Sequence, residues 1–274
     1  MTCRRPPNRS PIIDDHTAPE VPDAVPGTWN FRDIASVGGL QTGVLFRSAS
    51  LQYLGQDGHR ALQELGIGRV IDLRGPQEIA RDGAYRLGDG IEQVHIAFDG
   101  YVDLPTEYNK PGESDNQRLT SLLADVDAQT KLRAFFNATY VAMVRSPVAA
   151  AAIRDTLTSV TESDEPVLFH CQAGKDRTGW LSAVVLMLAD IPMEQVMADF
   201  LSSNRYTERL LRSLALPEGT DLGAAANLFE VREQYLVSAI AAVEETYATV
   251  PAYLDAIGFG PHLQARLRAK LVCS

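Results

Sequence analysis

The sequence predicts an α/β fold, because short apolar runs with the composition of buried strands alternate with helical segments in its first two thirds. Four runs carry this prediction: VLFRS at residues 44–48, RVIDLR at 69–74, IEQVHIAF at 91–98 and VLFH at 167–170. A helix is expected over residues 57–65, ending at Gly66. Another is expected to begin with Ser146 as N-cap and Pro147 in its first turn.

Beyond His170 we expect no further strand, and residues from Thr178 onward predict helices. The expected helix breaks lie near Pro192, Pro217, Pro251 and Pro261. Six prolines precede Gly27 with few large apolar residues between them, so residues 1–27 are expected to be a flexible tail. No repeat or linker interrupts the rest. Residues 28–274 therefore predict a single domain.

Composition excludes several classes of protein. With 45% hydrophobic and 22% charged residues, the chain of 274 residues is not predicted to be disordered as a whole. A net charge of -10 argues against nucleic acid or anionic membrane as a partner. The longest apolar run, residues 181–191, is too short to span a membrane, and the N-terminal segment lacks the apolar stretch of a secretory signal. The oligomeric state stays open.

Three scattered cysteines make a disulfide framework improbable and favour a reducing compartment. The expected location is therefore the cytoplasm, or outside the cell by export without a recognisable signal peptide. The three cysteines are Cys3, Cys171 and Cys273.

The most informative segment is VLFHCQAGKDRTGW at residues 167–180, an apolar strand, a short loop and an apolar helix. Such a unit directs backbone N–H groups and the positive end of the helix at one point, which is an anion site. Cys171 begins the loop and Arg177 follows six positions later, so both side chains can converge on one tetrahedral anion. A thiol near a helix N-terminus and cationic side chains such as Lys175 ionises readily and becomes nucleophilic.

Arg177 supplies the planar fork that grips two phosphoryl oxygens. Thr178 can place a hydroxyl near the sulfur, and its alternative role is the helix N-cap. An alcohol leaving group needs a proton, and two carboxyl groups are candidates for the general acid. Asp176 lies in the loop beside two cations that favour its ionised form, and Asp99 follows the strand that ends near Phe98.

Other readings of these residues fail on spacing. A nucleotide-binding P-loop would need glycine where Phe169 stands and serine or threonine where Asp176 stands. The five histidines form no metal-binding pattern, so neither a metal nor another cofactor is expected. His170 is expected to be a structural hydrogen-bonding residue. Arg47 and Arg74 can support the loop, or can simply pair with carboxylates, which is the preferred interpretation.

The acidic stretch between Asp99 and Asp127 contains seven carboxylates against two cations. It is expected to be a solvated loop.

The motif HCQAGKDRTG resembles the signature of the cysteine-based phosphatases, the protein tyrosine phosphatase superfamily. Further segments resemble one bacterial branch of it: WNFRDIASVGG at residues 29–39, LFRS at 45–48, IDLRGPQE at 71–78 and ADFLSSN at 198–204. The resemblance covers most of residues 28–274. It implies a small, mostly parallel central sheet flanked by helices, with a helical C-terminal half.

The resemblance also implies roles. Cys171 corresponds to the nucleophile, Arg177 to the phosphate-binding arginine and Asp176 to the general acid, with Lys175 contacting substrate charge. The implied substrate-binding residues are Gln172, Ala173, Gly174, Lys175 and Thr178. The family covers its active site with a helical lid, and the corresponding stretch here, residues 206–228, is short.

The function that follows is metal-independent hydrolysis of phosphomonoesters through a phosphocysteine, by a protein tyrosine or dual-specificity phosphatase. Members of the branch act on phosphotyrosine, phosphoserine or phosphothreonine and on phosphoinositides. The partner is then a phosphorylated protein or a phosphoinositide. Two alternatives remain open, a catalytically inactive phosphate-binding module and a rhodanese-like sulfurtransferase.

Overall fold

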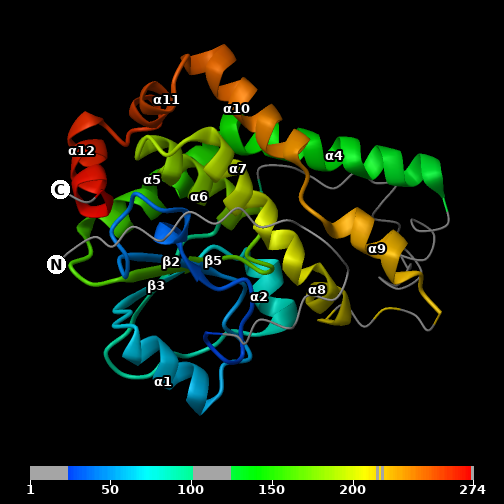
Figure 1. Ribbon diagram of the computed structural model, residues 1–274, viewed down its shortest axis with the longest axis horizontal. Coiled ribbons are helices and arrows are strands. Elements are labelled where there is room, and N and C mark those ends of the chain that lie inside the picture. Colours follow the sequence, from blue (N-terminus) through cyan, green and yellow to red (C-terminus); the bar gives the residue numbers. More distant parts are fainter. Residues whose placement is uncertain (1–23, 101–124, 214–215, 217–218, 273–274) are drawn as a thin grey trace.

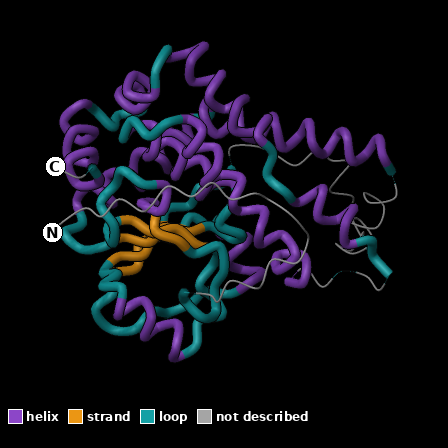
Figure 2. Tube along the Cα trace, viewed as in Figure 1, coloured by secondary structure: helices purple, strands orange, loops and turns teal. Residues whose placement is uncertain are grey.

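The computed structural model describes residues 24–100, 125–213, 216 and 219–272. A small sheet lies between two unequal layers, with helix α1 (Gln56–Glu64) on one side and most of the other helices on the opposite side (Figure 1). Figure 2 shows the strands as a small central part of a mostly helical molecule. The α/β class expected from the sequence is confirmed.

The sheet has five strands in the order β1-β2-β5-β3-β4. Their bounds are β1 (Arg32–Asp33), β2 (Leu45–Ser48), β3 (Arg69–Asp72), β4 (Glu92–His95) and β5 (Val167–His170). Only β1 is antiparallel to its neighbour. The four predicted strands are confirmed, although β3 and β4 are shorter than predicted. The sequence does not predict β1, because two residues are too few to show an alternating pattern.

Neighbouring residues of the central strands face opposite layers. Leu45, Ile71 and Phe169 belong to the larger core, whereas Phe46, Val70 and Leu168 pack with α1. Both faces of the central strands β2, β3 and β5 are therefore buried, which explains why these strands read as continuous apolar runs. The parallel strands end at one edge, and the candidate site lies at that edge.

The larger core is built around α6 (Asp176–Leu188), which is apolar on all sides and buried from Thr178 to Leu186. The other helices are α2 (Pro76–Asp82), α4 (Val126–Arg145), α5 (Pro147–Glu162), α7 (Met193–Ser202), α8 (Thr207–Ser213), α9 (Leu222–Phe229), α10 (Glu233–Tyr247), α11 (Val250–Ala256) and α12 (Pro261–Leu271), with short 3-10 turns η1 (Ile34–Val37) and η3 (Ser203–Tyr206).

Proline positions mark three helix starts, as expected. Pro192 is the N-cap residue of α7, Pro251 lies in the first turn of α11, and Pro261 is the first residue of α12. The fourth, Pro217, lies outside the described residues. None of the helices that the structure describes is long and apolar enough to cross a membrane.

The packed chain begins before residue 28. Val25 is fully buried and belongs to the smaller core with Leu62 and Leu168, so the predicted tail of residues 1–27 includes packed residues at its end. Residues 1–23 lie outside the described part. The same holds for most of the acidic stretch that follows Asp99.

The stretch that corresponds to the family's lid contains α8 and α9. Arg209 of α8 lies over the Trp29 ring at 5.6 Å from its centroid. Trp29 directly precedes Asn30, whose side chain donates a hydrogen bond to the Gly174 carbonyl in the candidate site. Helix α8 is therefore held against the segment that contacts the site.

Candidate active site

The motif folds as the predicted strand, loop and helix. β5 ends at His170, residues 171–175 form the loop, and α6 begins at Asp176. Cys171 is buried, with 2% of its surface exposed, and is not in a disulfide. The structure thus brings Cys171 and Arg177 to the two ends of one loop, in front of a helix N-terminus.

The 171–175 loop is held from outside through its carbonyl oxygens. The Gly174 oxygen accepts from Asn30 Nδ2 at 2.7 Å and from Arg47 Nη2 at 2.8 Å. The Gln172 oxygen accepts from the Ser50 amide at 3.0 Å. In a trans peptide the N–H points away from the carbonyl, so the amides of the following residues turn toward the inside of the loop.

Gly174 makes the sharp turn possible. Its φ is +66°, and a Cβ there would overlap the Ser48 carbonyl. Any side chain at this position would therefore push the loop away from β2.

Below the loop lies a buried charge network, which we call the underside and define as Asn30, Arg32, Arg47 and Asp199. Asp199 accepts from Arg47 Nη1 at 2.7 Å and from Arg32 Nε at 2.6 Å. Burial alone would raise the pKa of Asp199, but the two guanidinium charges hold it below its usual value. Burial and the Arg32 charge lower the pKa of Arg47 to about 10, although the charges of Asp199 and Cys171 oppose this shift.

The expectation that Arg47 and Arg74 pair with carboxylates is confirmed, since Arg74 binds Asp72 at 2.8 Å. Arg47 also takes the other role considered for it, because it supports the loop at Gly174.

His170 has the structural role expected for it. It is fully buried, its Nδ1 lies 3.0 Å from the Cys171 carbonyl, and its Nε2 bonds to the Tyr85 hydroxyl. Burial lowers the pKa of His170, whereas burial raises that of Tyr85. A neutral imidazole therefore donates from Nδ1 to the Cys171 carbonyl and accepts from Tyr85, which fixes the end of β5.

Arg177 forms an ion pair with Glu78, a residue that the sequence motifs did not indicate. Its Nη1 and Nη2 donate to the two Glu78 carboxylate oxygens, each at 2.6 Å. Glu78 also accepts from the Gly75 amide at 2.8 Å. Burial would raise the pKa of Glu78, but hydrogen bonds and charge from Arg177 lower it. The sequence contains a signal for the helix that carries Glu78. Pro76 and Glu78 occupy the first and third positions of a helix that begins shortly after a strand.

Asp176 has a partner for each carboxylate oxygen. Tyr140 of α4 donates to Oδ1 at 2.9 Å, and Lys175 lies 2.8 Å from Oδ2. The Lys175 ammonium also lies over the Phe136 ring, at 5.6 Å from its centroid. No sequence pattern singles out Tyr140, because α4 packs its apolar residues against other helices in the usual way.

Thr178 is buried inside the first turn of α6, and its hydroxyl has no hydrogen-bond partner among the described residues. Lys175 is the N-cap residue of this helix, so the alternative role of Thr178 as N-cap is wrong. The helix begins three residues earlier than that role requires. The Gln172 side-chain oxygen is likewise buried and unpartnered in the described part of the chain.

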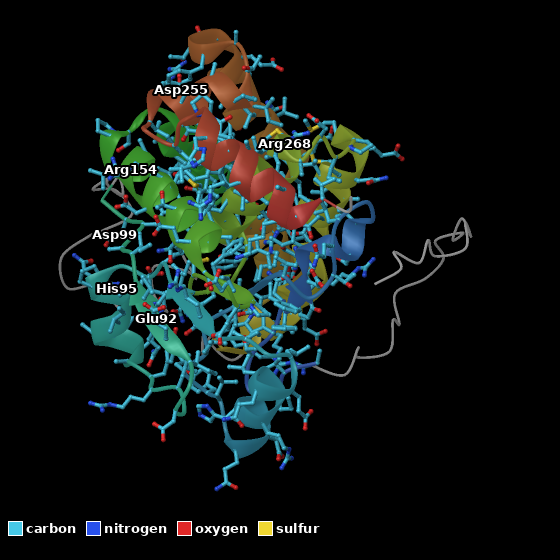
Figure 3. All side chains as sticks on the ribbon, turned by 90° about the vertical axis from the view of Figure 1, so that its left-hand side faces the viewer. Glu92, His95, Asp99, Arg154, Asp255 and Arg268 are labelled. Atoms are coloured by element: carbon cyan, nitrogen blue, oxygen red, sulfur yellow. The ribbon has the colours of Figure 1, made fainter. Side chains whose placement is uncertain are left out.

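Asp99 is the other candidate acid. It follows strand β4, and Figure 3 shows it above Glu92 and His95 of that strand. Its carboxylate packs so closely on Gly75 that a Cβ on that glycine would overlap it. The preceding carbonyl, of Phe98, lies 3.5 Å from Arg177 Nη1. Asp99 thus follows a residue whose carbonyl reaches Arg177, and Asp176 precedes Arg177 in the chain, so both remain candidates.

Comparison with known proteins agrees with the family resemblance of the motif. A model of the tyrosine phosphatase family matches residues 24–273. The triple specificity protein phosphatase PtpB of Mycobacterium tuberculosis is 31% identical over 274 residues, covering 90% of this chain and 98% of that protein. A tyrosine-protein phosphatase of Nostoc commune is 24% identical, covering 97% of this chain and 86% of that protein.

Among solved structures, the core catalytic domain of the PP-IP phosphatase SIW14 from S. cerevisiae, in complex with citrate, is 16% identical with a TM-score of 0.35. It covers 81% of this chain and 96% of that domain. That likeness is too distant to bear on function. The family match and the identity to PtpB extend over nearly the whole chain, and the chain belongs to the tyrosine phosphatase family.

Proposed function

We propose that this protein hydrolyses phosphomonoesters through a phosphocysteine formed on Cys171. One observation carries the proposal: Cys171 and Arg177 stand at the two ends of one loop whose carbonyls are bonded outward to Asn30, Arg47 and Ser50. The loop amides and Arg177 can then surround a phosphoryl group above the sulfur.

In the first step the Cys171 thiolate attacks phosphorus, and the bond from phosphorus to the leaving oxygen breaks. The leaving oxygen takes a proton from a carboxyl group, for which we propose Asp176. Lys175 is the last residue of the loop and pairs with Asp176, so an arriving phosphate dianion competes with Asp176 for its ammonium.

In the second step water attacks the phosphorus of the phosphocysteine and gives a proton to the Asp176 carboxylate. The bond from sulfur to phosphorus breaks, and the thiolate is restored. A hydrogen bond from the unpartnered Thr178 hydroxyl would stabilise the leaving sulfur. Arg177 has five N–H donors on a rigid fork, so its two bonds to Glu78 orient it for phosphate.

The proposed substrates are phosphorylated proteins, on tyrosine and on serine or threonine, and phosphoinositides. This range rests on the family match and on the naming of PtpB as a triple specificity phosphatase. The reducing compartment predicted from the cysteines stays a prediction.

The test is phosphate release by wild type and by Cys171→Ser, in EDTA, from a phosphotyrosine peptide, a phosphothreonine peptide and phosphoinositides. We expect release by wild type only, and the rates rank the substrates. Equal release by Cys171→Ser would overturn the cysteine mechanism. Phosphate binding without release from any substrate would instead identify a non-catalytic phosphate-binding protein.

A further inference from the structure

Two arginines outside the loop converge without a negative partner among the residues that the structure describes. Arg133 of α4 donates from Nη2 to the Asn227 side-chain oxygen at 3.4 Å, and Arg232 at the start of α10 donates to the same oxygen. Arg232 also donates to the Asn227 carbonyl at 3.0 Å. The three helices involved, α4, α9 and α10, lie together on one side of the molecule (Figure 1). We call these residues the arginine pair and its bridging amide.

The arginine pair is not neutralised by the part of the chain that the structure describes. Asn227 is uncharged, and neither guanidinium lies within ion-pair distance of a described carboxylate, whereas Arg177 and Arg47 each bind one. The Nε of each paired arginine is shielded from solvent and has no hydrogen-bond partner among the described residues. Two like charges held together would attract an anion, and a guanidinium fork binds one with paired hydrogen bonds.

The arginine pair shares a neighbour with the 171–175 loop. Tyr235 follows Arg232 by one turn of α10, and its ring stacks on that of Tyr140 with centroids 5.5 Å apart. Tyr140 in turn donates to Asp176. Burial raises the pKa of Tyr235, the charges of Arg232 and Arg133 oppose this shift, and that of Asp176 reinforces it. One hydroxyl thus lies within the electrostatic reach of both the loop and the pair.

From this placement we infer that Arg133 and Arg232 bind a second phosphate of the substrate, and that the preferred substrate is an inositol ring carrying at least two phosphates. The inference rests on the proposed function, since the first phosphate must occupy the 171–175 loop. Arginine forks match phosphate geometry. An inositol ring holds its phosphates on one rigid frame, and the stacked rings of Tyr140 and Tyr235 connect the two anion sites.

A competing explanation is structural. Arg232 bonds a carbonyl in the last turn of α9, where a cation stabilises a helix C-terminus. The variant Asn227→Asp separates the two explanations. It keeps both arginines and gives them a carboxylate, so it neutralises the pair while preserving the contacts to α9.

The experiment measures kcat/KM of the full chain for an inositol monophosphate and an inositol bisphosphate, for wild type, Arg133→Gln, Arg232→Gln and Asn227→Asp. We expect each variant to lower the preference for the bisphosphate by about tenfold. Arg145→Gln is the matched control, because it removes an α4 arginine that pairs with Glu245 on the surface. It should leave the preference unchanged.

Several outcomes would overturn the inference. An unchanged preference in Asn227→Asp, together with an unchanged or raised melting temperature, would leave only the structural role. A change confined to a doubly phosphorylated peptide would assign the pair to a protein substrate. If wild type hydrolyses neither inositol phosphate nor any phosphopeptide, the proposed function itself fails.

The same headgroups on phosphatidylcholine vesicles form a second arm. A preference lost by the variants in both arms supports direct contact with the second phosphate, whether the ring is free or part of a lipid. A loss seen only on vesicles would show that the arginines read surface charge, which contradicts the inference.

Discussion

The 171–175 loop is supported by two sets of charged side chains that differ in burial. The underside, where Arg47 and Asp199 are 0% and 3% exposed, fixes the backbone of the loop. The set above, which we call the rim and define as Lys175, Asp176, Arg177 and Glu78, is partly exposed, with 14% for Arg177 and 22% for Glu78.

The difference follows from what each set must do. A buried ion pair has no water to replace a lost partner, so the underside holds one geometry. Rim side chains remain in contact with solvent and can exchange a carboxylate for a substrate oxygen. The comparison predicts that underside variants change stability and that rim variants change turnover.

The largest effect is expected for Arg177→Lys. Lysine keeps the charge but loses the fork that follows phosphoryl oxygens through the transition state, so kcat/KM should fall by about 10³-fold or more. Chemical denaturation should show only a small change in stability. Activity within tenfold of wild type would place the phosphate contact on another residue.

The next effect is on stability. Asp199→Asn leaves two guanidinium groups without a carboxylate, and we expect a loss of about 3 kcal/mol in the free energy of unfolding, measured in urea. Glu78→Gln, the matched rim variant, should cost about 1 kcal/mol because its pair is partly solvated. Equal losses in the two variants would contradict the distinction between underside and rim.

Lowering the pH gives a second test of the contribution that Asp199 makes to stability. The pKa of Asp199 is lowered in the folded protein, so its contribution to stability is complete above the ordinary aspartate pKa of about 3.9. That contribution is lost as the pH falls through the lowered value. The stability gap between wild type and Asp199→Asn should therefore narrow below about pH 4. Asp72 and Glu78 also have lowered pKa values, but they are common to both proteins.

Asp176→Asn should lower kcat by about 10²-fold for an alkyl phosphate and by much less for an aryl phosphate with a good leaving group. The reason is that only a poor leaving group needs the proton. Asp99→Asn is the matched variant at the other candidate acid, which follows the Phe98 carbonyl that lies 3.5 Å from Arg177 Nη1. If Asp99→Asn shows the dependence on the leaving group and Asp176→Asn does not, Asp99 is the general acid and the assignment to Asp176 is wrong.

The smallest effect is expected for Tyr140→Phe. Loss of its hydrogen bond to Asp176 should lower kcat for the alkyl phosphate about fivefold and stability by about 1 kcal/mol. Tyr253→Phe removes a buried hydroxyl in α11 and serves as the control. If both variants lower kcat equally, Tyr140 acts only through stability.

Local patterns predicted the strands β2, β3, β4 and β5. They also predicted the placement of Cys171 and Arg177, because strand, loop and helix follow one another in the sequence. Local patterns did not predict which side chains bind Arg177, Arg47 and Asp176. Glu78, Asp199 and Tyr140 reach the site from separate helices, and nothing in their own segments records which residue they face. The N-cap alternative for Thr178 failed because α6 begins at Asp176, which only the geometry of the loop decides.

The supports of the loop come from distant parts of the chain. Asn30 reaches Gly174 across 144 residues, Arg47 does so across 127, and Glu78 reaches Arg177 across 99. A peptide containing only HCQAGKDRTG lacks every one of these bonds, and a growing chain lacks the underside until Asp199 has been synthesised. Closing such long segments is slow and entropically costly. Phosphate binding during refolding should therefore appear late, as a sign that assembly is complete.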